Sequence, residues 1–302
     1  MGFTNGSKVA LVARDDYFTD ALAGGPLAKF VSYKYGSSAP ILLTNSHQLT
    51  DQTRQEIQKL GAETIYLLGG PGAVDDQVKN DLGAIPGVKV VNRLWGLSSY
   101  GTAKAIKEEM DSIAAEKGIN KPDIAIITTG ENFPDSLVIS GPAASKNMPI
   151  LLVKPWTSEP PDETKQALQG LKNIIIVGGP GAVHPYLEDW LNRSGHTVMK
   201  RLWGNSEYDT AIDVISSGNS IFNFNKSTTL VTRGDYFTDA LSGGAFASQG
   251  PYPMVLVDTG SIPDVTNLWL IGNKSEIQTI YILGGWGAVS DSVLGQITGI
   301  VK

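Results

Sequence analysis

The sequence predicts an α/β protein made of three similar modules, each with a parallel β-sheet covered by helices. The first observation behind this prediction is an internal repeat, because short signatures return in the same order along the 302 residues. The second is the alternation of short apolar runs with helical segments, which is typical of parallel sheets. The third is that runs such as 124–127 and 174–177 are apolar throughout, so we expect these strands to be buried on both faces.

Three signatures define the repeat. The first has the pattern aromatic-Phe-x-Asp-small-Leu, with Asn replacing the aromatic in the middle copy; the second is Gly-Gly-x-Gly-Ala-Val; the third is Arg-Leu-Trp-Gly followed by Tyr and Thr. The copies lie roughly 110 residues apart, well above the roughly 20–50 residues of solenoid units, so each copy is expected to hold its own core. The signatures begin at residues 17, 132 and 236, at 69, 178 and 284, and at 93 and 201.

The expected modules span residues 1–92, 93–200 and 201–302. Segment 100–117 should form an amphipathic helix between the first two modules, and 216–227 a looser link before the third. In the first module the expected elements are strands at 9–12, 41–44, 64–68 and 88–91, and helices from Thr19, over 51–60 and from Asp75.

The third signature is distributed asymmetrically. The last residues of the chain stand in the register of residues 87–90, so no Arg-Leu-Trp-Gly element follows the third copy, and none precedes the first copy. Two alternatives stay open. Either the sequence is cut at a module boundary, or the first module receives this element from elsewhere.

Composition and charge exclude several classes of function. Lys and Arg total 24 against 30 Asp and Glu, and the net charge of −6 offers no general positive field for nucleic acid or an acidic membrane surface. The absence of cysteine excludes disulfides, thiolate metal sites and a cysteine nucleophile. Residues 1–7 do not resemble a signal peptide and no apolar run reaches membrane-spanning length, so we expect no membrane insertion.

The Gly-Gly-x-Gly-Ala-Val signature lies between a strand and a helix, where glycine permits positive φ and helix N–H groups can cradle a phosphate. It matches neither the dinucleotide-binding pattern nor the lysine-bearing phosphate loop, which favours a tight structural turn over a nucleotide site. The glycines of these turns are Gly69, Gly70, Gly72, Gly178, Gly179, Gly181, Gly284, Gly285 and Gly287.

Asp20, Asp135 and Asp239 recur at the start of the helix after the first strand of each copy, near the sheet edge where ligands usually bind. A general base needs a poised partner, and no His, Lys or second acid recurs with these residues. We therefore interpret them as first-turn carboxylates that complement the helix dipole. The three histidines occupy non-equivalent positions, so the sequence predicts no metal site, no cofactor and no catalytic centre.

The arginines of the third signature have two open interpretations. Arg93 and Arg201 could hold a carboxylate or phosphate of a polymer, with the following tryptophan offering a flat face to a sugar ring. Alternatively, each arginine could clamp a carboxylate of a neighbouring module, with the tryptophan packed into the junction. The candidate polymer-binding residues are Arg93, Trp95, Arg201, Trp203, Arg14 and Arg233, the last two with a solvated edge as the alternative.

Segment Gly130–Leu137, the turn at 177–183 and the Arg-Leu-x-Gly…Tyr-x-Thr-Ala element together resemble the type 2 cell-wall-binding repeat, found as tandem triplets in surface proteins and autolysins of Gram-positive bacteria, notably clostridia. The resemblance covers nearly the whole chain and implies three Rossmann- or Toprim-like modules packed about a pseudo-threefold axis. The chain departs from the family pattern at Ser99 and Glu207, where the family has Arg before the Tyr, and at Trp286, which replaces the turn proline.

The resemblance further implies a non-catalytic module that anchors a surface-layer protein or autolysin non-covalently to an anionic polymer, either a secondary wall polysaccharide or a teichoic-acid-like polymer. It also implies an extracellular location at the cell wall and a fused effector domain. Three linked weak sites would gain avidity on a repetitive polymer, and we expect the binding to be electrostatic and to lie where modules meet. Two alternatives stay open: a scaffold module that contacts only protein, and an α/β enzyme that acts on a sugar or nucleotide.

Overall fold

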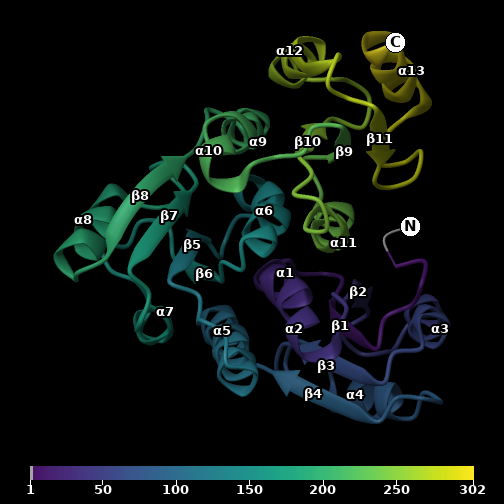
Figure 1. The fold of residues 1–302 in the computed structure, drawn as a ribbon, viewed down its shortest axis with the longest axis vertical. Helices are drawn as coiled ribbons and strands as arrows, with labels where there is room; N and C mark the ends of the chain where they lie inside the picture. Colours follow the sequence, from purple (N-terminus) through teal and green to yellow (C-terminus); the bar gives the residue numbers. More distant parts are fainter. Residues whose placement is uncertain (1–2) are drawn as a thin grey trace.

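The computed structural model describes residues 3–302 and contains three parallel β-sheets covered by helices (Figure 1). The strand orders are β2-β1-β3-β4, β6-β5-β7-β8 and β10-β9-β11, so the same topology recurs, with a fourth strand in the first two sheets. Every recorded strand pair is parallel. The prediction of three α/β modules arranged with pseudo-threefold symmetry is confirmed.

The first module alternates strands and helices, as its apolar runs and helix caps predict. Thr50 caps one helix by accepting a hydrogen bond from the Thr53 amide, and Gly61 ends that helix with a left-handed φ of 68°. The elements are β1 (Val9–Arg14), α1 (Thr19–Phe30), α2 (Ser32–Tyr35), β2 (Ile41–Thr44), α3 (Asp51–Leu60), β3 (Thr64–Leu68), α4 (Asp76–Gly83) and β4 (Val90–Leu94).

Helix α5 (Ser99–Lys117) leads into the second module, and α9 (Glu207–Ser216) leads into the third. The second module consists of β5 (Ile124–Thr129), the 3₁₀ helix η1 (Pro134–Ile139), α6 (Ser140–Ser145), β6 (Ile150–Val153), α7 (Asp162–Ala167), β7 (Asn173–Val177), α8 (Pro185–Arg193) and β8 (Thr197–Leu202). The third consists of α10 (Asn219–Phe222), β9 (Thr228–Arg233), α11 (Thr238–Ala247), β10 (Met254–Val257), α12 (Asp264–Asn273), β11 (Thr279–Ile282) and α13 (Asp291–Val301).

The expected module boundaries after residues 92 and 200 fall inside β4 and β8. Both strands continue through their Arg-Leu pair and remain hydrogen-bonded to β3 and β7. The arginines of the third signature therefore belong to the sheet that precedes them. The segment expected to be a loose link, 216–227, contains the short helix α10.

Helices α5 and α9 hold successive modules together. Helix α5 packs against α1 of the first module and against β6 and α7 of the second. Helix α9 packs in the same way against η1 of the second module and against β10 and α12 of the third. The segments β4–α5 and β8–α9 are therefore equivalent strand–turn–helix units. In each unit, the strand completes the sheet of one module and the helix packs against the next module. Figure 1 shows these helices between the modules that they join.

The three modules meet around helices α1, α6 and α11, which lie at the centre of Figure 1. Small residues let these helices approach closely. A Cβ atom added at Gly25 would lie 1.9 Å from the Ser140 hydroxyl oxygen, and one added at Gly141 would lie 2.4 Å from the Cβ of Ala247. Glycine at these positions is therefore required by the packing between modules.

Three phenylalanines from the first signature form an aromatic cluster at the centre. The ring centroids of Phe18, Phe133 and Phe237 are separated by 5.9, 6.2 and 5.5 Å, all in tilted or edge-on geometry. One continuous hydrophobic core includes these rings and residues of all three modules. The first signature is thus the element through which the modules share a core. Among the described residues, no helix is long and apolar enough to cross a membrane.

Replacing Phe18 by Ala should lower the free energy of unfolding by about 3–5 kcal/mol, because it opens a cavity where three modules meet. Urea and thermal unfolding of the two proteins measure this effect. Leu97→Ala is the control, since Leu97 is fully exposed and its loss should change stability by less than about 0.5 kcal/mol. A small and equal effect of both substitutions would contradict the structural role of the cluster.

Candidate functional site

Two pockets occupy equivalent positions in the first and second modules. Each opens at the carboxyl edge of its sheet, between the loop after the first strand and the glycine turn after the third strand. This is the point where the strand order changes direction, the usual ligand position in open parallel sheets. The second-module pocket has a volume of about 620 Å³ and the first-module pocket about 460 Å³.

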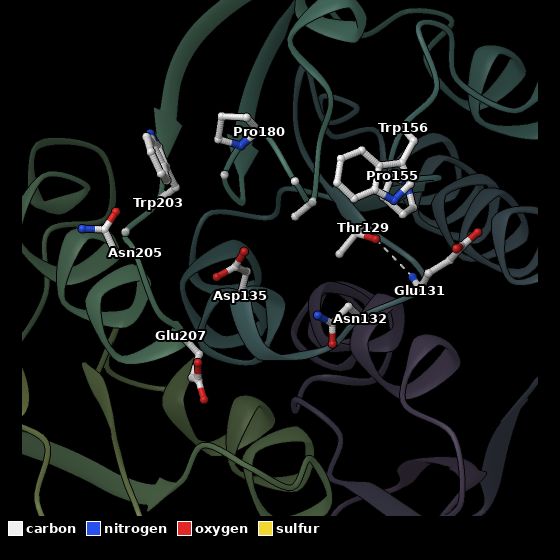
Figure 2. Close-up of a pocket in the computed structure, with 14 residues that line it drawn as sticks. Thr129, Glu131, Asn132, Asp135, Pro155, Trp156, Pro180, Trp203, Asn205 and Glu207 are labelled. Atoms are coloured by element: carbon white, nitrogen blue, oxygen red, sulfur yellow. Dashed lines mark hydrogen bonds between the residues drawn. The ribbon is translucent and has the colours of Figure 1, made fainter.

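Each pocket is completed by the turn that leads into the next linking helix, so both lie where modules meet. The second-module pocket (Figure 2) is lined mainly by Thr129, Glu131, Asn132, Asp135, Trp156, Trp203 and Glu207. The first-module pocket is lined mainly by Arg14, Tyr17, Asp20, Gly70, Trp95, Ser98 and Thr102.

Arg93 and Arg201 lie behind the glycine turns and do not face the pockets. The Arg93 Nη1 donates to the carbonyl oxygens of Gly69 (3.0 Å) and Val74 (2.7 Å), and its Nη2 contacts Asp76 at 3.1 Å. The Arg93 side chain is only 6% exposed. Its guanidinium therefore closes the turn from within.

Arg201 makes the same contacts in the second module. Its Nη1 donates to the carbonyl oxygens of Gly178 and Val183, both at 2.9 Å, and its Nε and Nη2 donate to Glu188 at 3.0 and 2.9 Å. These hydrogen bonds lie within the second module and join β8 to the glycine turn and to helix α8.

The recorded contacts do not match the interpretation in which each arginine clamps a carboxylate of a neighbouring module, because the carboxylates lie in the arginine's own module. The Nη donors of Arg93 and Arg201 are used by the glycine turn and by a carboxylate on the following helix of the same module, Asp76 of α4 or Glu188 of α8. The Arg93 Nε is buried and has no hydrogen-bond partner among the described residues. Burial also lowers the pKa of Arg93. The correction has a physical reason: the strand after the glycine turn runs beside it, so the nearest acceptors are the carbonyl oxygens of that turn.

The first glycine of each turn has a positive φ, which favours glycine at this position. Gly69 and Gly178 adopt φ values of 101° and 124°, and Gly284 adopts 105° in the third module. The amides of Ala73 and Val74 donate to the Gly70 carbonyl oxygen, so they are committed within the turn. Any Cβ at Gly72, Gly285 or Gly287 would meet open space, and one at Gly181 would be 3.9 Å from Trp156.

In the first and second modules, the second glycine of the turn has a different role, because a tryptophan packs on it. A Cβ at Gly70 would lie 2.6 Å from the Trp95 ring, and one at Gly179 would lie 2.8 Å from the Trp203 ring. The two side chains are nevertheless 45% and 42% exposed. Each indole is thus held against the backbone of the turn on one side while much of it stays open to solvent.

The recurring aspartates lie at the base of the pockets. Asp20 and Asp135 stand in the first helical turn, as expected, but their carboxylates also bind the threonine at the start of the next linking helix. The Thr210 hydroxyl donates to Asp135 Oδ1 at 2.7 Å. In the first module, the side chain of Thr102 interacts with Asp20 and lowers the pKa of that carboxyl, against the larger effect of burial. We call this contact the Asp–Thr junction bond.

The threonine of each junction bond is fixed by the turn that precedes it. The amides of Gly96 and Gly204 donate to the hydroxyl oxygens of Thr102 (3.3 Å) and Thr210 (3.0 Å), so each hydroxyl accepts one hydrogen bond and donates another. Ser98 caps α5 by accepting from the Gly101 amide. The Trp-Gly turn, the cap and the threonine therefore act as one rigid unit.

Burial controls the ionisation of these aspartates. It raises the pKa of Asp20 to about 6, and the nearby Arg14 and the Thr102 hydrogen bond offset the effect only in part. Burial also raises the pKa values of Asp135 and Asp239. Ordinary desolvation accounts for these shifts, and no second titratable group is paired with the Asp20 carboxylate as an acid–base partner would be.

Arg14 and Arg233 occupy the equivalent position predicted for them, at the end of the first strand. Each forms a bidentate ion pair with the aspartate two residues later, Asp16 or Asp235, and this pairing lowers the pKa of both carboxylates, that of Asp16 to about 2. Arg14 lines the first-module pocket, and its guanidinium lies 5.9 Å from the ring centroid of Tyr17. Arg14 is therefore a partly neutralised basic group at a pocket.

The second-module pocket contains features that sequence reasoning missed. Trp156 is 75% exposed, has a left-handed φ of 63°, and lies across the pocket from Trp203, with Asp135 between them (Figure 2). Trp156 lies outside the repeated signatures, so no pattern singled it out. By contrast, the recurrence of Thr102 and Thr210 after Arg-Leu-Trp-Gly was a usable signal for the junction bonds.

The charge of the second-module pocket also differs from expectation. Glu131, Asp135 and Glu207 line it, and no lysine or arginine is found among its described lining residues. Glu131 also accepts a hydrogen bond from the Tyr100 hydroxyl of α5, at 3.3 Å. Across residues 3–302, no cluster of three or more His, Cys, Asp or Glu side chains has a geometry suited to a metal ion.

Comparison with known proteins identifies the class. Residues 3–79, 93–188 and 201–294 each match the family Cell wall binding domain 2 (CWB2). The chain belongs to this family, as three tandem copies of its domain. The resemblance seen in the sequence is thereby confirmed.

The chain is similar to parts of longer proteins. It is 29% identical over 259 residues to the amidase enhancer of Bacillus subtilis (strain 168), covering 86% of this chain and 32% of that protein. It is 22% identical over 291 residues to the N-acetylmuramoyl-L-alanine amidase LytC of the same organism, covering 96% of this chain and 53% of that protein. The chain thus spans about a third to a half of these relatives.

Solved structures share the fold. Cwp6 from Clostridium difficile superposes with a TM-score of 0.82 at 22% identity, covering 100% of this chain and 45% of that chain. Cwp8 from Clostridium difficile superposes with a TM-score of 0.78 at 22% identity, covering 98% of this chain and 47% of that chain. The three-module α/β architecture is therefore shared with these proteins.

The raised pKa of Asp20 predicts a specific pH dependence. Because the folded pKa of about 6 lies above the usual value of 3.8, protonation of this carboxyl stabilises the fold. The stabilisation is complete below about pH 4 and is lost as the pH rises through about 6, a change of about 3 kcal/mol. Asp20→Asn cannot titrate, so the stability of the parent relative to this variant should increase from pH 7 to pH 4. A difference that stays constant across this range would contradict the assignment.

Proposed function

We propose that this chain is a non-catalytic anchor that binds a polysaccharide of the bacterial cell wall without a covalent bond. The observation that carries this proposal is the pair of equivalent pockets, each with a half-exposed tryptophan held flat against a glycine turn. An exposed indole supplies a rigid apolar surface for a sugar ring, and the carboxylate and amide groups around it can bind hydroxyl groups. Membership of the cell-wall-binding family supports this assignment of the ligand.

The duplication of the pocket supports a polymeric ligand. Trp95 and Trp203 lie in equivalent surroundings within one rigid core, so two stretches of a repetitive polymer can be bound at once. Linked sites raise the apparent affinity by effective concentration without any new contact. Weak single-sugar binding is thus sufficient for retention on a wall.

The anionic character of the polymer stays a prediction. Arg93 and Arg201 serve the turns, so the basic group that a polymer can reach at a pocket is Arg14, which is already paired with Asp16. We therefore propose that the sugar rings, and not their charges, make the main contacts at Trp95 and Trp203. Weak dependence of wall binding on salt is the expected consequence.

The proposal that the chain is non-catalytic rests on the contacts of its buried carboxylates. Asp20 and Asp135 are engaged by Thr102 and Thr210, which supports a structural function for these groups. An extracellular location at the wall and a fused effector region fit the coverage of the relatives, one of which is named as an amidase. A scaffold module that contacts only protein is the alternative, and the experiment below separates the two.

The test is retention on purified cell walls with and without removal of the non-peptidoglycan polymers. Trp95→Ala with Trp203→Ala should reduce retention at least tenfold on intact walls, because both sugar platforms are lost. Trp286→Ala is the matched control, since this tryptophan is 83% exposed and lines neither pocket. Equal retention of the double variant and the parent, with both folded, would argue against the pockets. Absence of wall binding by the parent would favour the scaffold.

Arg201→Lys separates the structural role of this arginine from polymer binding. Lysine cannot reproduce the contacts of the guanidinium with two carbonyl oxygens and Glu188, so we expect a loss of about 1–3 kcal/mol in stability. Wall retention of the folded variant should stay within about twofold of the parent, a change of only about 0.4 kcal/mol. If the Arg201→Lys variant is as stable as the parent but is no longer retained on walls, Arg201 contributes to polymer binding and not to stability.

A further inference from the structure

The two equivalent pockets differ in charge, although the same elements of the fold form them. In the register of the repeated signatures, Thr129 takes the place of Arg14, and Glu131 takes the place of Asp16. The ion pair between Arg14 and Asp16 in the first module therefore has no counterpart at these positions of the second module. The second-module pocket keeps the carboxylate of this pair and loses its cation.

No cation has replaced the lost arginine beside Glu131. Glu131 is exposed, its amide donates to the Thr129 hydroxyl at 3.2 Å, and its carboxylate accepts from the Tyr100 hydroxyl. Lys154 is the basic residue next to this loop, and its Nζ lies over the Tyr100 ring, 5.9 Å from the centroid. Lys154 is not among the described lining residues of the pocket.

The linking helix adds a further carboxylate. Helix α9 begins at Glu207, whereas α5 begins at Ser99, and both residues line their pockets. None of the ion pairs recorded among residues 3–302 includes Glu131 or Glu207. Figure 2 shows Asp135 between these two glutamates. The second-module pocket thus carries three carboxylates, two of them without a counter-charge in the protein.

This pocket also presents two indole rings. Trp156 and Trp203 lie across the pocket from each other and are both exposed, whereas Trp95 is the one tryptophan among the described lining residues of the first-module pocket. The face of an indole packs on a sugar ring and also attracts a cation. A ligand that has both a ring and a positive charge therefore matches the rings and the carboxylates together.

A second hollow continues from Trp203. It has a volume of about 380 Å³ and shares Trp203 and the two residues after it with the main pocket. Asp209 and Asp213 line it, where the first module has Gly101 and Ala105. Asp213 accepts a hydrogen bond from the Trp203 amide at 3.0 Å, which holds this carboxylate beside the ring. The acidic surface therefore extends past one sugar unit, along the path that a chain of sugars would take.

We propose that the second-module pocket selects a sugar with a free, protonated amino group, an unacylated hexosamine unit of a polymer. The proposal rests on the function proposed above for this pocket as a sugar site. The ammonium group donates to Glu131 or Glu207 in charge-assisted hydrogen bonds, while the sugar ring packs on an indole. Acylation of the amine removes the positive charge and with it the preference.

The preference belongs to the second module. Arg14 and Ser99 occupy the equivalent positions of the first-module pocket, so a positive charge gains less there. The sugar rings still make the main contacts in both pockets, and the amino group decides between one sugar and another. A polymer can carry such a unit beside neutral or anionic units.

The test compares two oligosaccharides that differ only in acylation, a glucosamine tetramer and the N-acetylglucosamine tetramer with the same linkages. Calorimetric titration of the 302-residue chain is carried out at mildly acidic pH, so that the amino groups carry a proton. The glucosamine tetramer should bind at least about fivefold more tightly, and the preference should shrink as added salt screens the charges.

Glu131→Gln with Glu207→Gln should reduce this preference to within about twofold, because the counter-charges are removed at nearly constant shape. Asp51→Asn with Asp264→Asn is the matched control, since it removes two exposed carboxylates that line neither pocket. Thr129→Arg is a second test, because it places an arginine where the first module has Arg14 and should also abolish the preference.

Four results would overturn the proposal. Equal, Trp203-dependent binding of both tetramers would leave the sugar site in place but remove its selectivity for an amine. Failure of both tetramers to bind would do the same if the parent is retained on walls, and would also refute the sugar site if it is not. A lysine tetramer that binds as tightly would assign the pocket to cationic peptides. An equal loss of preference in the control pair would assign it to net charge alone.

Discussion

The Asp–Thr junction bond is the interaction on which the rest of the structure depends. Asp20 and Asp135 lie in helices of the shared core, whereas Thr102 and Thr210 begin the helices that cover the next module. A buried carboxylate is costly unless it is hydrogen-bonded, so the linking helix is held at one position. The bond thereby fixes the Trp-Gly turn, the tryptophan over the glycine turn, and the pocket between them.

This dependence links the proposed ligand sites to the folding of the modules. The walls of these two pockets come from the sheet of one module and from the segment that leads to the next, so each pocket depends on the contact between two modules. Arg93 and Arg201 contribute from behind by holding the carbonyl oxygens of the glycine turns. The guanidinium groups of these two arginines thus act within the protein, and the surface at the second-module pocket combines exposed aromatic rings with carboxylates.

The architecture could be predicted from the sequence, whereas the roles of several side chains could not. Repeated signatures and unbroken apolar runs are sufficient to predict three parallel-sheet modules, and paired glycines between a strand and a helix are sufficient to predict a tight turn. The contacts of Arg93 depend on where β4 lies relative to the turn at Gly69, which no local pattern specifies. Trp156 is not repeated, and its place across the pocket from Trp203 arises only from the folded loops.

A double-mutant cycle on the second junction bond tests the central claim most directly. The free energy of unfolding is measured for the parent, Asp135→Asn, Thr210→Val and the double variant. If the bond holds the junction, the two substitutions should be coupled by about 0.5–3 kcal/mol, because either one alone removes the same interaction. Additivity within about 0.3 kcal/mol would show that Asp135 and Thr210 act independently, and would contradict the account.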